Sequence, residues 1–315
     1  MKILVTGANG FVGRALFLHL LRLGHDCIGV AREAKNITAG VSTVAMGDIA
    51  GAVDWGEVLK GVDCIIHLAG RAHKLKDKAD NPELEFERTN YDATMALVRQ
   101  AVAVGVKRFI YLSSIGVHGQ ESGVHAFSEK TPFAASSPYT KSKLKAEKQI
   151  REYLCDQSME WVVIRPPLVY SGQAPGNFKL LLELVSRRLP LPFSGVVNQR
   201  SMIALENLVD FLVFCMEHPR AAREEFVISD GDQFAIGEIA SLLAIGMGVK
   251  TLQFYVPTKL LRLGATLIGR RNTYTQLFGS LTVDSSKACS LGWQPVISGR
   301  TALIKAGHDF IFHAS

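Results

Sequence analysis

Residues 2–6, KILVT, lead directly into residues 7–13, GANGFVG, at the start of the chain. The first stretch has the composition of a buried strand, and the apolar pattern from Phe11 to Leu23 predicts a helix. In a turn of this spacing the first glycine permits a tight bend, the second lets the backbone approach a pyrophosphate, and the third lets helix and strand pack closely. Free N–H groups at the helix start attract phosphate charge. This stretch therefore predicts a dinucleotide-binding turn, with a glycine turn that holds no ligand as the alternative.

After the turn, strands and helices alternate along the chain. We expect further strands at residues 26–31, 42–46, 64–69, 108–112 and 161–164, and helices at residues 83–104 and 142–155. Such alternation predicts the α/β class, with a Rossmann-type, doubly wound parallel sheet and helices on both of its faces. Ligands of these sheets bind at the carboxyl ends of the strands.

The pattern changes after Arg165. A loop with several prolines and glycines is followed by a predicted helix at residues 178–188, and then by loops, short strands and helices. We expect the NAD(P)-binding Rossmann domain to comprise residues 1–166 and about 202–230, with residues 226–228 returning one strand to its sheet. A smaller α/β substrate-binding lobe should comprise residues 167–201 and about 231–315.

Amino-acid composition limits the classes of function that we expect for this chain. The 315 residues are 48% hydrophobic and carry a net charge of +6, which suits a compact protein with an anionic small-molecule ligand. No nucleic-acid motif accompanies this charge, so we expect no nucleic-acid partner. The five cysteines are odd in number and far apart, as in reduced cytoplasmic proteins. Neither C-x-x-C nor H-x-x-x-H occurs, so we expect no metal site.

Apolar segments also bear on location. No uninterrupted apolar run reaches the roughly 18 residues of a membrane span, and a strand at the very start leaves no room for a signal peptide. We therefore expect a cytoplasmic protein that begins at Met1. Residues 257–271 combine leucines with Lys259, Arg262 and Arg270. This pattern is typical of a packed helix in the second lobe, with a helix on a membrane surface as the alternative.

Residues 139–143, YTKSK, place Tyr139 and Lys143 four residues apart at the start of a helix, hence on one face. An ammonium group beside a tyrosine favours phenolate, which lets the tyrosine act as an acid or base near neutral pH. Alone, the pair is as typical of an ordinary helix surface. However, Ser113 and Ser114 come directly after a predicted strand, at the edge of the sheet where ligands bind.

Together these motifs give the chain a resemblance to the extended short-chain dehydrogenase/reductase family, the NAD-dependent epimerases, dehydratases and reductases. The motifs span nearly the whole chain, at residues 6–13, 48–49, 67–70, 113–114, 139–143, 165–167 and 291–295. The resemblance implies that Tyr139 transfers the proton, that Lys143 lowers its pKa and holds the nicotinamide ribose, and that Ser114 hydrogen-bonds the reacting oxygen. Ser114 is preferred to Ser113 because it stands five residues before Gly119, as in the family.

The family also has a tyrosine where this chain has His118, for which we expect a structural role, with a substrate contact as the alternative. Cofactor contacts are expected from the glycine turn, from the residues that would meet the adenine, diphosphate and nicotinamide, and from the catalytic pair: Gly7, Asn9, Gly10, Phe11, Val12, Gly13, Asp48, Ile49, Leu68, Ala69, Gly70, Tyr139, Lys143, Pro166, Leu168 and Val169.

The end of the second predicted strand bears on the choice of dinucleotide. An NAD site places Asp or Glu there, because a carboxylate accepts hydrogen bonds from the ribose 2′-hydroxyl and repels a 2′-phosphate. This chain has Ala31 and Arg32, so NADP(H) is favoured and NAD(H) is the alternative. Arg14 or Lys35 would assist Arg32, which could instead stack on adenine or remain solvated.

The two residues after Ser114 bear on which of the family's reactions the chain catalyses. Dehydratases of the family carry Asp-Glu there, whereas this chain has Ile115 and Gly116, so dehydration is disfavoured. Residues 165–170, 177–178 and 198–201 resemble a branch that uses NADPH to reduce the 4-keto group of UDP-2-acetamido-2,6-dideoxy-hexos-4-ulose. The product, UDP-N-acetylquinovosamine, serves surface polysaccharide such as the O-antigen of lipopolysaccharide.

In that interpretation, a UDP-sugar is held by Asn177, Phe178 and Arg200. A second phosphate-binding arginine of the family is replaced by Tyr274, with Arg270 or Arg271 as substitutes. A homodimer through the helices near residues 83–104 and 142–155 is also implied. The alternatives are a UDP-hexose 4-epimerase, acting on UDP-glucose or UDP-GlcNAc with tightly held NAD, and a catalytically silent NADP-binding sensor.

Overall fold

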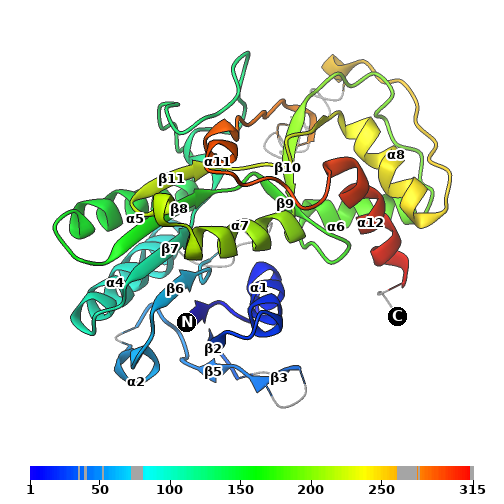
Figure 1. The fold of residues 1–315 in the computed structure, drawn as a ribbon. Coiled ribbons are helices and arrows are strands. Elements are labelled where there is room, and N and C mark those ends of the chain that lie inside the picture. The colour runs from blue at the N-terminus through cyan, green and yellow to red at the C-terminus, as the bar shows by residue number, and fades with distance from the viewer. Residues whose placement is uncertain are drawn as a thin grey trace.

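The computed structural model describes residues 1–34, 36–38, 41–51, 53–71, 81–260, 275 and 277–312. A seven-stranded sheet with the order β11-β8-β7-β6-β1-β2-β5 is its main layer (Figure 1). All of its neighbouring strands pair in parallel. The strands are β1 (Lys2–Thr6), β2 (Asp26–Ala31), β5 (Val44–Ala45), β6 (Cys64–His67), β7 (Arg108–Leu112), β8 (Glu160–Arg165) and β11 (Glu224–Val227). The predicted α/β class with a Rossmann-type sheet is confirmed.

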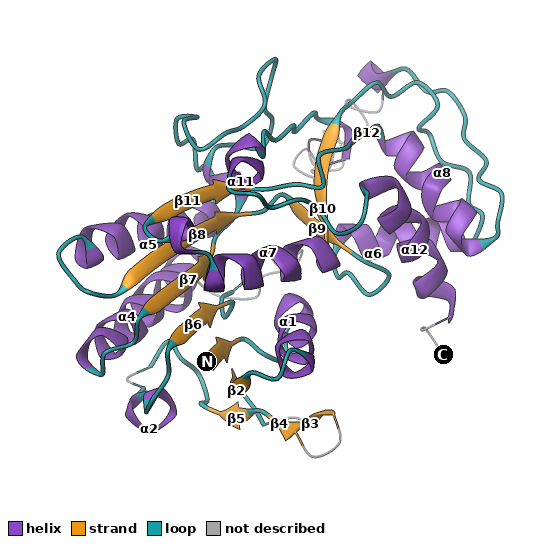
Figure 2. Ribbon diagram, viewed as in Figure 1, coloured by secondary structure: helices purple, strands orange, loops and turns teal. Residues whose placement is uncertain are grey.

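Helices cover both faces of this sheet (Figure 2). One face is covered by α1 (Phe11–Arg22) and α7 (Leu205–Glu217), and the other by α2 (Gly56–Leu59), α4 (Ala93–Ala103) and α5 (Pro138–Leu154). The pleat divides the strand residues between two cores: Ile3 and Val5 of β1 belong to the first, and Leu4 to the second. The continuous apolar strands seen in the sequence are explained by this burial on both faces.

A second lobe has its own core. Its three-stranded sheet has the order β12-β10-β9, and the strands are β9 (Leu168–Tyr170), β10 (Arg200–Ala204) and β12 (Gln233–Phe234). Three helices pack around it, namely α6 (Asn177–Ser186), α8 (Ile236–Met247) and α12 (Gly299–Phe312). Close contact of α8 with α12 depends on glycine, because a Cβ on Gly246 would lie 1.8 Å from the Ile304 carbonyl oxygen.

Two predicted helices differ from those observed. The helix expected from residue 142 begins at Pro138, because Ser137 caps it: the Ser137 hydroxyl accepts from the Thr140 N–H at 3.2 Å, and the Thr140 hydroxyl accepts from the Ser137 N–H at 3.1 Å. The helix expected at residues 83–104 is instead α3 (Pro82–Glu87), a π-helical turn η1 (Arg88–Asp92) and then α4.

Smaller differences occur near the sheet edge and in short elements. Of the strand expected at residues 42–46, only β5 joins the main sheet, while β4 (Val41–Ser42) pairs with β3 (Asn36–Thr38) in an antiparallel hairpin. The helix expected at residues 178–188 is α6. Short helical elements lie at η2 (Ile115–Val117), η3 (Pro219–Ala221) and α11 (Ser286–Ser290).

Some predicted features fall outside the described residues, namely Lys35, Tyr274 and residues 261–271 of the amphipathic segment, with Arg262, Arg270 and Arg271. Within the described ranges, no helix combines the length and the apolar character that crossing a membrane requires.

Candidate active site

The glycine turn joins β1 to α1 in a shape that side chains would prevent. Gly7 has a φ of +69°, and a Cβ there would lie 2.9 Å from the Ala69 backbone nitrogen. A Cβ on Gly13 would lie 2.1 Å from the Gly7 carbonyl oxygen, and one on Gly10 3.1 Å from the same atom. The turn therefore presents bare backbone at the carboxyl end of β1, which is the geometry a pyrophosphate requires.

The start of α1 completes this backbone surface. Gly10 is the N-cap, and neither a capping side chain nor an acidic residue occupies the first turn. Asn9 ties the turn to the chain after β2, because its Nδ2 donates to the Glu33 carbonyl at 3.0 Å. The side chains of Val12 and Phe11 are partly buried against the cores of the main sheet and of the second lobe, respectively. A helix N-terminus of this kind favours an anion.

A cavity of about 410 Å³ opens beside this turn. We name it the glycine-turn cavity. It brings together six of the residues predicted to bind the dinucleotide, namely Gly7, Arg32, Asp48, Ile49, Ala69 and Gly70. The predicted contact Leu68 packs instead against the core of the main sheet. Arg71, which the sequence did not single out, also lines the cavity.

A histidine at the end of β6 holds the loop that faces Gly7. The Thr94 hydroxyl donates to the Asn90 carbonyl, so it accepts from His67 Nε2 at 3.0 Å, which leaves His67 Nδ1 to accept from the Thr6 hydroxyl at 2.8 Å. The Thr6 oxygen accepts from the Ala69 N–H at 3.1 Å. Burial, together with the positive charge of Lys143, lowers the pKa of His67 to about 3, so the ring stays neutral.

A second cavity of about 370 Å³ lies between the two lobes. We name it the tyrosine cavity. Among the predicted site residues it is lined by Ser114, Tyr139, Leu168, Asn177, Phe178 and Arg200. Two other predicted residues lie behind its wall: the Pro166 carbonyl accepts from the Ile115 N–H at 2.9 Å, and Val169 packs against the core of the main sheet. Pro167, part of the motif at residues 165–167, also lines this cavity, as do Gln120 and Ser137, which the sequence did not mark.

Tyr139 sits in the first turn of α5 and is partly buried. Burial raises the pKa of its phenol, and a hydrogen bond with Ser114 opposes that rise. The ring meets Phe86 of α3 edge to face, with centroids 6.0 Å apart. Ser114, which caps η2 by accepting from the Gly116 N–H at 3.2 Å, thus joins the end of β7 to the tyrosine.

Lys143 lies one turn further along α5 and is buried. Its Nζ donates to the Leu112 carbonyl at 2.9 Å and stands 4.6 Å from the centre of the Tyr111 ring. Burial lowers the pKa of Lys143 to about 8, and the Glu147 carboxylate partly opposes this shift. The ammonium group is therefore poorly solvated and lies at the carboxyl end of β7.

Asn90 links Arg71, beside the glycine-turn cavity, to Ser142 of α5, and sequence reasoning missed it. It lies in the π-helical turn, where its Oδ1 accepts from the Arg71 N–H at 2.7 Å and its Nδ2 donates to the Arg71 carbonyl at 3.1 Å and to the Ser142 hydroxyl at 3.0 Å. A Cβ on Gly70 would lie 3.0 Å from Asn90 Oδ1 and 3.4 Å from Lys143 Nζ. No local pattern predicts these contacts, because they depend on tertiary packing.

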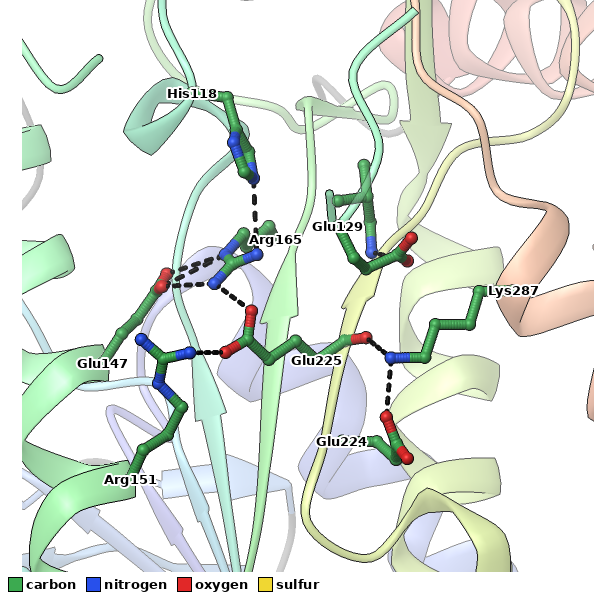
Figure 3. Close-up of polar contacts among 9 residues, drawn as sticks. His118, Glu129, Glu147, Arg151, Arg165, Glu224, Glu225 and Lys287 are labelled. Atoms are coloured by element: carbon green, nitrogen blue, oxygen red, sulfur yellow. Dashed lines mark hydrogen bonds and ion pairs between the residues drawn. The ribbon is translucent and has the colours of Figure 1, made fainter. Parts of the chain in front are cut away.

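A buried ion-pair network lies behind the tyrosine cavity (Figure 3). Arg165 at the end of β8 donates to Glu147 at 2.7 Å and to Glu225 of β11, and both Arg165 and Glu147 are fully buried. Arginine only donates, so His118 Nε2 accepts from it, at 3.3 Å. Burial and Arg165 lower the pKa of His118. His118 thus contacts Arg165 in the protein interior.

Arg200 at the start of β10 supplies positive charge to the tyrosine cavity. Its Nη1 donates to the Gly279 carbonyl at 2.8 Å, and burial lowers the pKa of its guanidinium, which the Glu121 carboxylate opposes. Among the described residues no carboxylate lies within ion-pair distance of it. A buried guanidinium of this kind suits a phosphate or diphosphate group. The same ranges contain no group of histidine, cysteine and carboxylate side chains that could hold a metal ion.

A turn of bare backbone at the carboxyl end of β1, beside a Ser-Tyr-Lys set at the end of β7 and the start of α5, is the arrangement typical of NAD(P)-binding enzymes of the α/β class. The chain belongs to the NAD dependent epimerase/dehydratase family, whose model matches residues 3–236. It is 38% identical over 298 residues to a UDP-glucose 4-epimerase of Vibrio cholerae, covering 93% of this chain and 90% of that protein.

Solved structures agree on the fold. The UDP-glucose 4-epimerase of Thermotoga maritima, determined with UDP-glucose, superimposes with a TM-score of 0.79 at 20% identity and full coverage of both chains. The UDP-glucuronic acid 4-epimerase of Bacillus cereus, determined with NAD, gives 0.79 at 23% identity and covers 100% of this chain and 99% of that one.

Proposed function

We propose that this protein is an NAD(P)-dependent enzyme acting at C4 of a UDP-linked hexose, and that it interconverts 4-epimers such as those of UDP-glucose or UDP-GlcNAc. The observation that carries the proposal is the placement of Ser114 and Tyr139 on the wall of the tyrosine cavity, with Lys143 one turn from Tyr139. The 38% identity to a UDP-glucose 4-epimerase over nearly the whole chain supports this substrate class over the 4-keto sugar expected from the sequence.

The residues of the glycine-turn cavity fit a dinucleotide. Gly7 and Gly13 let neighbouring backbone segments approach closely, because a Cβ at Gly7 would lie 2.9 Å from the Ala69 nitrogen and one at Gly13 2.1 Å from the Gly7 carbonyl oxygen, and the uncapped start of α1 suits the pyrophosphate. Asp48 and Ile49 would meet the adenine, and the backbone at residues 68–70 the diphosphate. When bound, the dinucleotide supplies chemistry that side chains lack, by accepting and returning a hydride.

Proton transfer is the task of the chain itself. Tyr139 would take the proton from O4 of the sugar and return it, while Ser114 donates a hydrogen bond to the same oxygen. Lys143, protonated below its pKa of about 8, would favour the phenolate form of Tyr139 and so oppose the rise in the tyrosine pKa that burial causes.

Substrate binding would use the far end of the tyrosine cavity. Arg200 would pair with the diphosphate, because its buried guanidinium has no carboxylate partner among the described residues. Asn177 and Phe178, at the start of α6, would contact the nucleoside. Phe178 is buried against Tyr170, which holds it rigid for this contact.

Net reduction of a 4-keto sugar is the second candidate, and one observation favours it. Arg32, exposed at the end of β2, lines the glycine-turn cavity where an NAD site carries a carboxylate. Its charge suits the 2′-phosphate of NADP(H), and a consumed NADPH implies a net reduction rather than recycling.

One assay separates the two candidates. The purified protein is incubated with UDP-glucose, with UDP-GlcNAc and, in the presence of NADPH, with a UDP-4-keto sugar, and the sugars are resolved by chromatography while absorbance monitors the reduced cofactor. Epimerase activity yields the 4-epimer with no net change in cofactor. Stoichiometric NADPH oxidation by a UDP-4-keto sugar, without epimer formation, would instead establish the reductase. If the protein binds the dinucleotide but catalyses neither reaction, the catalytically silent NADP-binding sensor is the remaining interpretation.

Three further expectations complete the proposal. The division into a dinucleotide domain (residues 1–166 and about 202–230) and a substrate lobe (residues 167–201 and about 231–315) is tested by limited proteolysis. The homodimer through α3, α4 and α5 is tested by analytical ultracentrifugation. A cytoplasmic location, where nucleotide sugars and NAD(P) are available, is tested by cell fractionation.

A further inference from the structure

Exposed apolar side chains are concentrated on one edge of the second lobe. The described chain exposes 19 large hydrophobic side chains, and seven of them lie in only two short segments, residues 179–197 and 250–260. These seven are Leu180, Leu189, Val197, Leu252, Phe254, Tyr255 and Leu260. We name the exposed side chains of these two segments together the basic apolar edge. Clusters of exposed apolar side chains of this kind mark binding surfaces.

Hydrogen bonds join the two segments into one surface. The Leu191 N–H donates to the Leu252 carbonyl at 2.9 Å, and the Phe254 N–H donates to the Leu191 carbonyl at 3.0 Å. The Tyr255 ring lies over Gly195, where a Cβ would be 2.4 Å away. In Figure 1 the chain after α6 and the chain after α8 run up the side of the molecule farthest from β1 and β2.

This edge is separate from the tyrosine cavity. Phe178 and Leu181 of α6 are buried and line that cavity, whereas Leu180, on the same helix, is 47% exposed. The apolar residues of the edge are therefore not accounted for by the proposed substrate site.

The charged side chains of the edge are mostly positive. The two segments contain the exposed cations Lys179, Arg187, Arg188, Lys250 and Lys259, against a single carboxylate, Glu183. Over the whole chain the ratio is 35 cations to 29 carboxylates, so the edge is far more basic than the chain as a whole. Exposed apolar and aromatic side chains beside Lys and Arg are the pattern of surfaces that bind anionic lipid.

We propose that the basic apolar edge docks on an anionic lipid surface, with Leu252 and Phe254 entering the headgroup region and Arg187 and Arg188 pairing with lipid phosphates. A second copy of this chain fits less well, since a two-fold contact of the edge with itself would bring its cations face to face. The proposal does not depend on the catalytic activity and describes how the protein is placed on a membrane.

Vesicle co-sedimentation tests this directly. The full-length protein is centrifuged with vesicles of phosphatidylglycerol and phosphatidylcholine, or of phosphatidylcholine alone, at low and at high salt. We expect binding to the anionic vesicles only, and its loss at high salt, because salt screens the charges. Absence of binding at low salt, or equal binding to neutral vesicles, would overturn the proposal.

Paired variants locate the contact. In the first double variant, Arg187→Glu is combined with Arg188→Glu. It should lower the partition coefficient between vesicles and solution by roughly fivefold or more for each substituted residue. Leu252→Ser with Phe254→Ser should lower it about tenfold through lost apolar burial. The control Val124→Ser, at a residue that is 96% exposed outside the edge, should leave binding unchanged.

Two checks keep the outcome clear. Thermal unfolding of each variant establishes that it is folded, and UDP-sugar turnover should be unchanged, because none of these residues lines either cavity. If the paired variants bind vesicles like the parent protein, the edge is not the lipid contact. If they instead dissociate a dimer in ultracentrifugation, the edge belongs to a second copy and the proposal is wrong.

Discussion

The glycine-turn cavity and the tyrosine cavity are built in different ways. The first depends on close backbone packing: a Cβ on Gly7 or Gly13 would clash with neighbouring backbone atoms, and a helix N-terminus supplies the favourable dipole. The second is enclosed by side chains from both lobes, among them Ser114, Phe178 and Arg200.

Because of this difference, we expect cofactor binding to depend on the backbone of the first cavity and catalysis to depend on the side chains of the second. A binding site made of backbone tolerates substitution of most side chains but not of its glycines. In a site made of side chains, each substitution removes the contact or proton transfer that the replaced residue provides. The charged network of Arg165, Glu147 and Glu225 behind the tyrosine cavity supports the second kind, because it links β8, α5 and β11. Substitutions in the two cavities should therefore fail in different ways, and four predictions test this.

The largest effect is expected from Tyr139→Phe. Removing the hydroxyl removes the proton donor and acceptor, so kcat should fall about 10²- to 10⁴-fold, with little change in the affinity for UDP. The ring and its contact with Phe86 remain, so the fold should be retained. Steady-state kinetics and calorimetric titration with UDP measure the two quantities. Turnover close to that of the parent protein would show that Tyr139 is not the acid or base.

Gly13→Ala should damage the other cavity through the fold itself. The new Cβ would lie 2.1 Å from the Gly7 carbonyl oxygen, so β1 and α1 must move apart. We expect a loss of about 3 kcal/mol in the free energy of unfolding, together with loss of dinucleotide binding. Urea unfolding and fluorescence titration measure these effects. Gly51→Ala is the matched control, because its Cβ would be 3.4 Å from its nearest neighbour and should change little.

Lys143 should make stability depend on pH. Its pKa is about 8 in the folded protein and 10.5 as the unperturbed value, so between these limits the unfolded chain binds more protons. The free energy of unfolding of the parent protein should therefore rise with pH over this interval, relative to Lys143→Met, by up to about 3 kcal/mol. Urea unfolding at a series of pH values tests this. A difference that is constant from pH 7 to above pH 10 would contradict it.

The smallest effect is expected at Arg32, on the rim of the backbone-built cavity. Arg32→Glu should raise the KM for NADPH about tenfold and lower that for NADH, because a carboxylate repels the 2′-phosphate and accepts from a 2′-hydroxyl. Arg32→Lys, which keeps the charge, is the control. Equal KM ratios for all three proteins would remove Arg32 from cofactor selection and favour NAD.

Prediction from sequence succeeded where structure is local. The strands β1, β2 and β7 and the helix α1 lie within a residue or so of their predicted bounds, because each carries its own apolar pattern. It failed at the start of α5, where the reciprocal Ser137 and Thr140 hydrogen bonds extend the helix to Pro138. The π-helical turn that contains Asn90 was also missed, since its partners Arg71 and Ser142 are distant in sequence.

The same contrast between local and long-range interactions holds for the two cavities. Amino-acid sequence by itself determined the alternating α/β order, the glycine turn and the spacing of Tyr139 and Lys143, because backbone geometry and helix periodicity act over a few residues. Only the tertiary structure decided which side chains enclose the tyrosine cavity, that His118 accepts from Arg165, and that exposed apolar residues after α6 and α8 form one edge. Those contacts join segments far apart along the chain, and only packing of the two lobes brings them together.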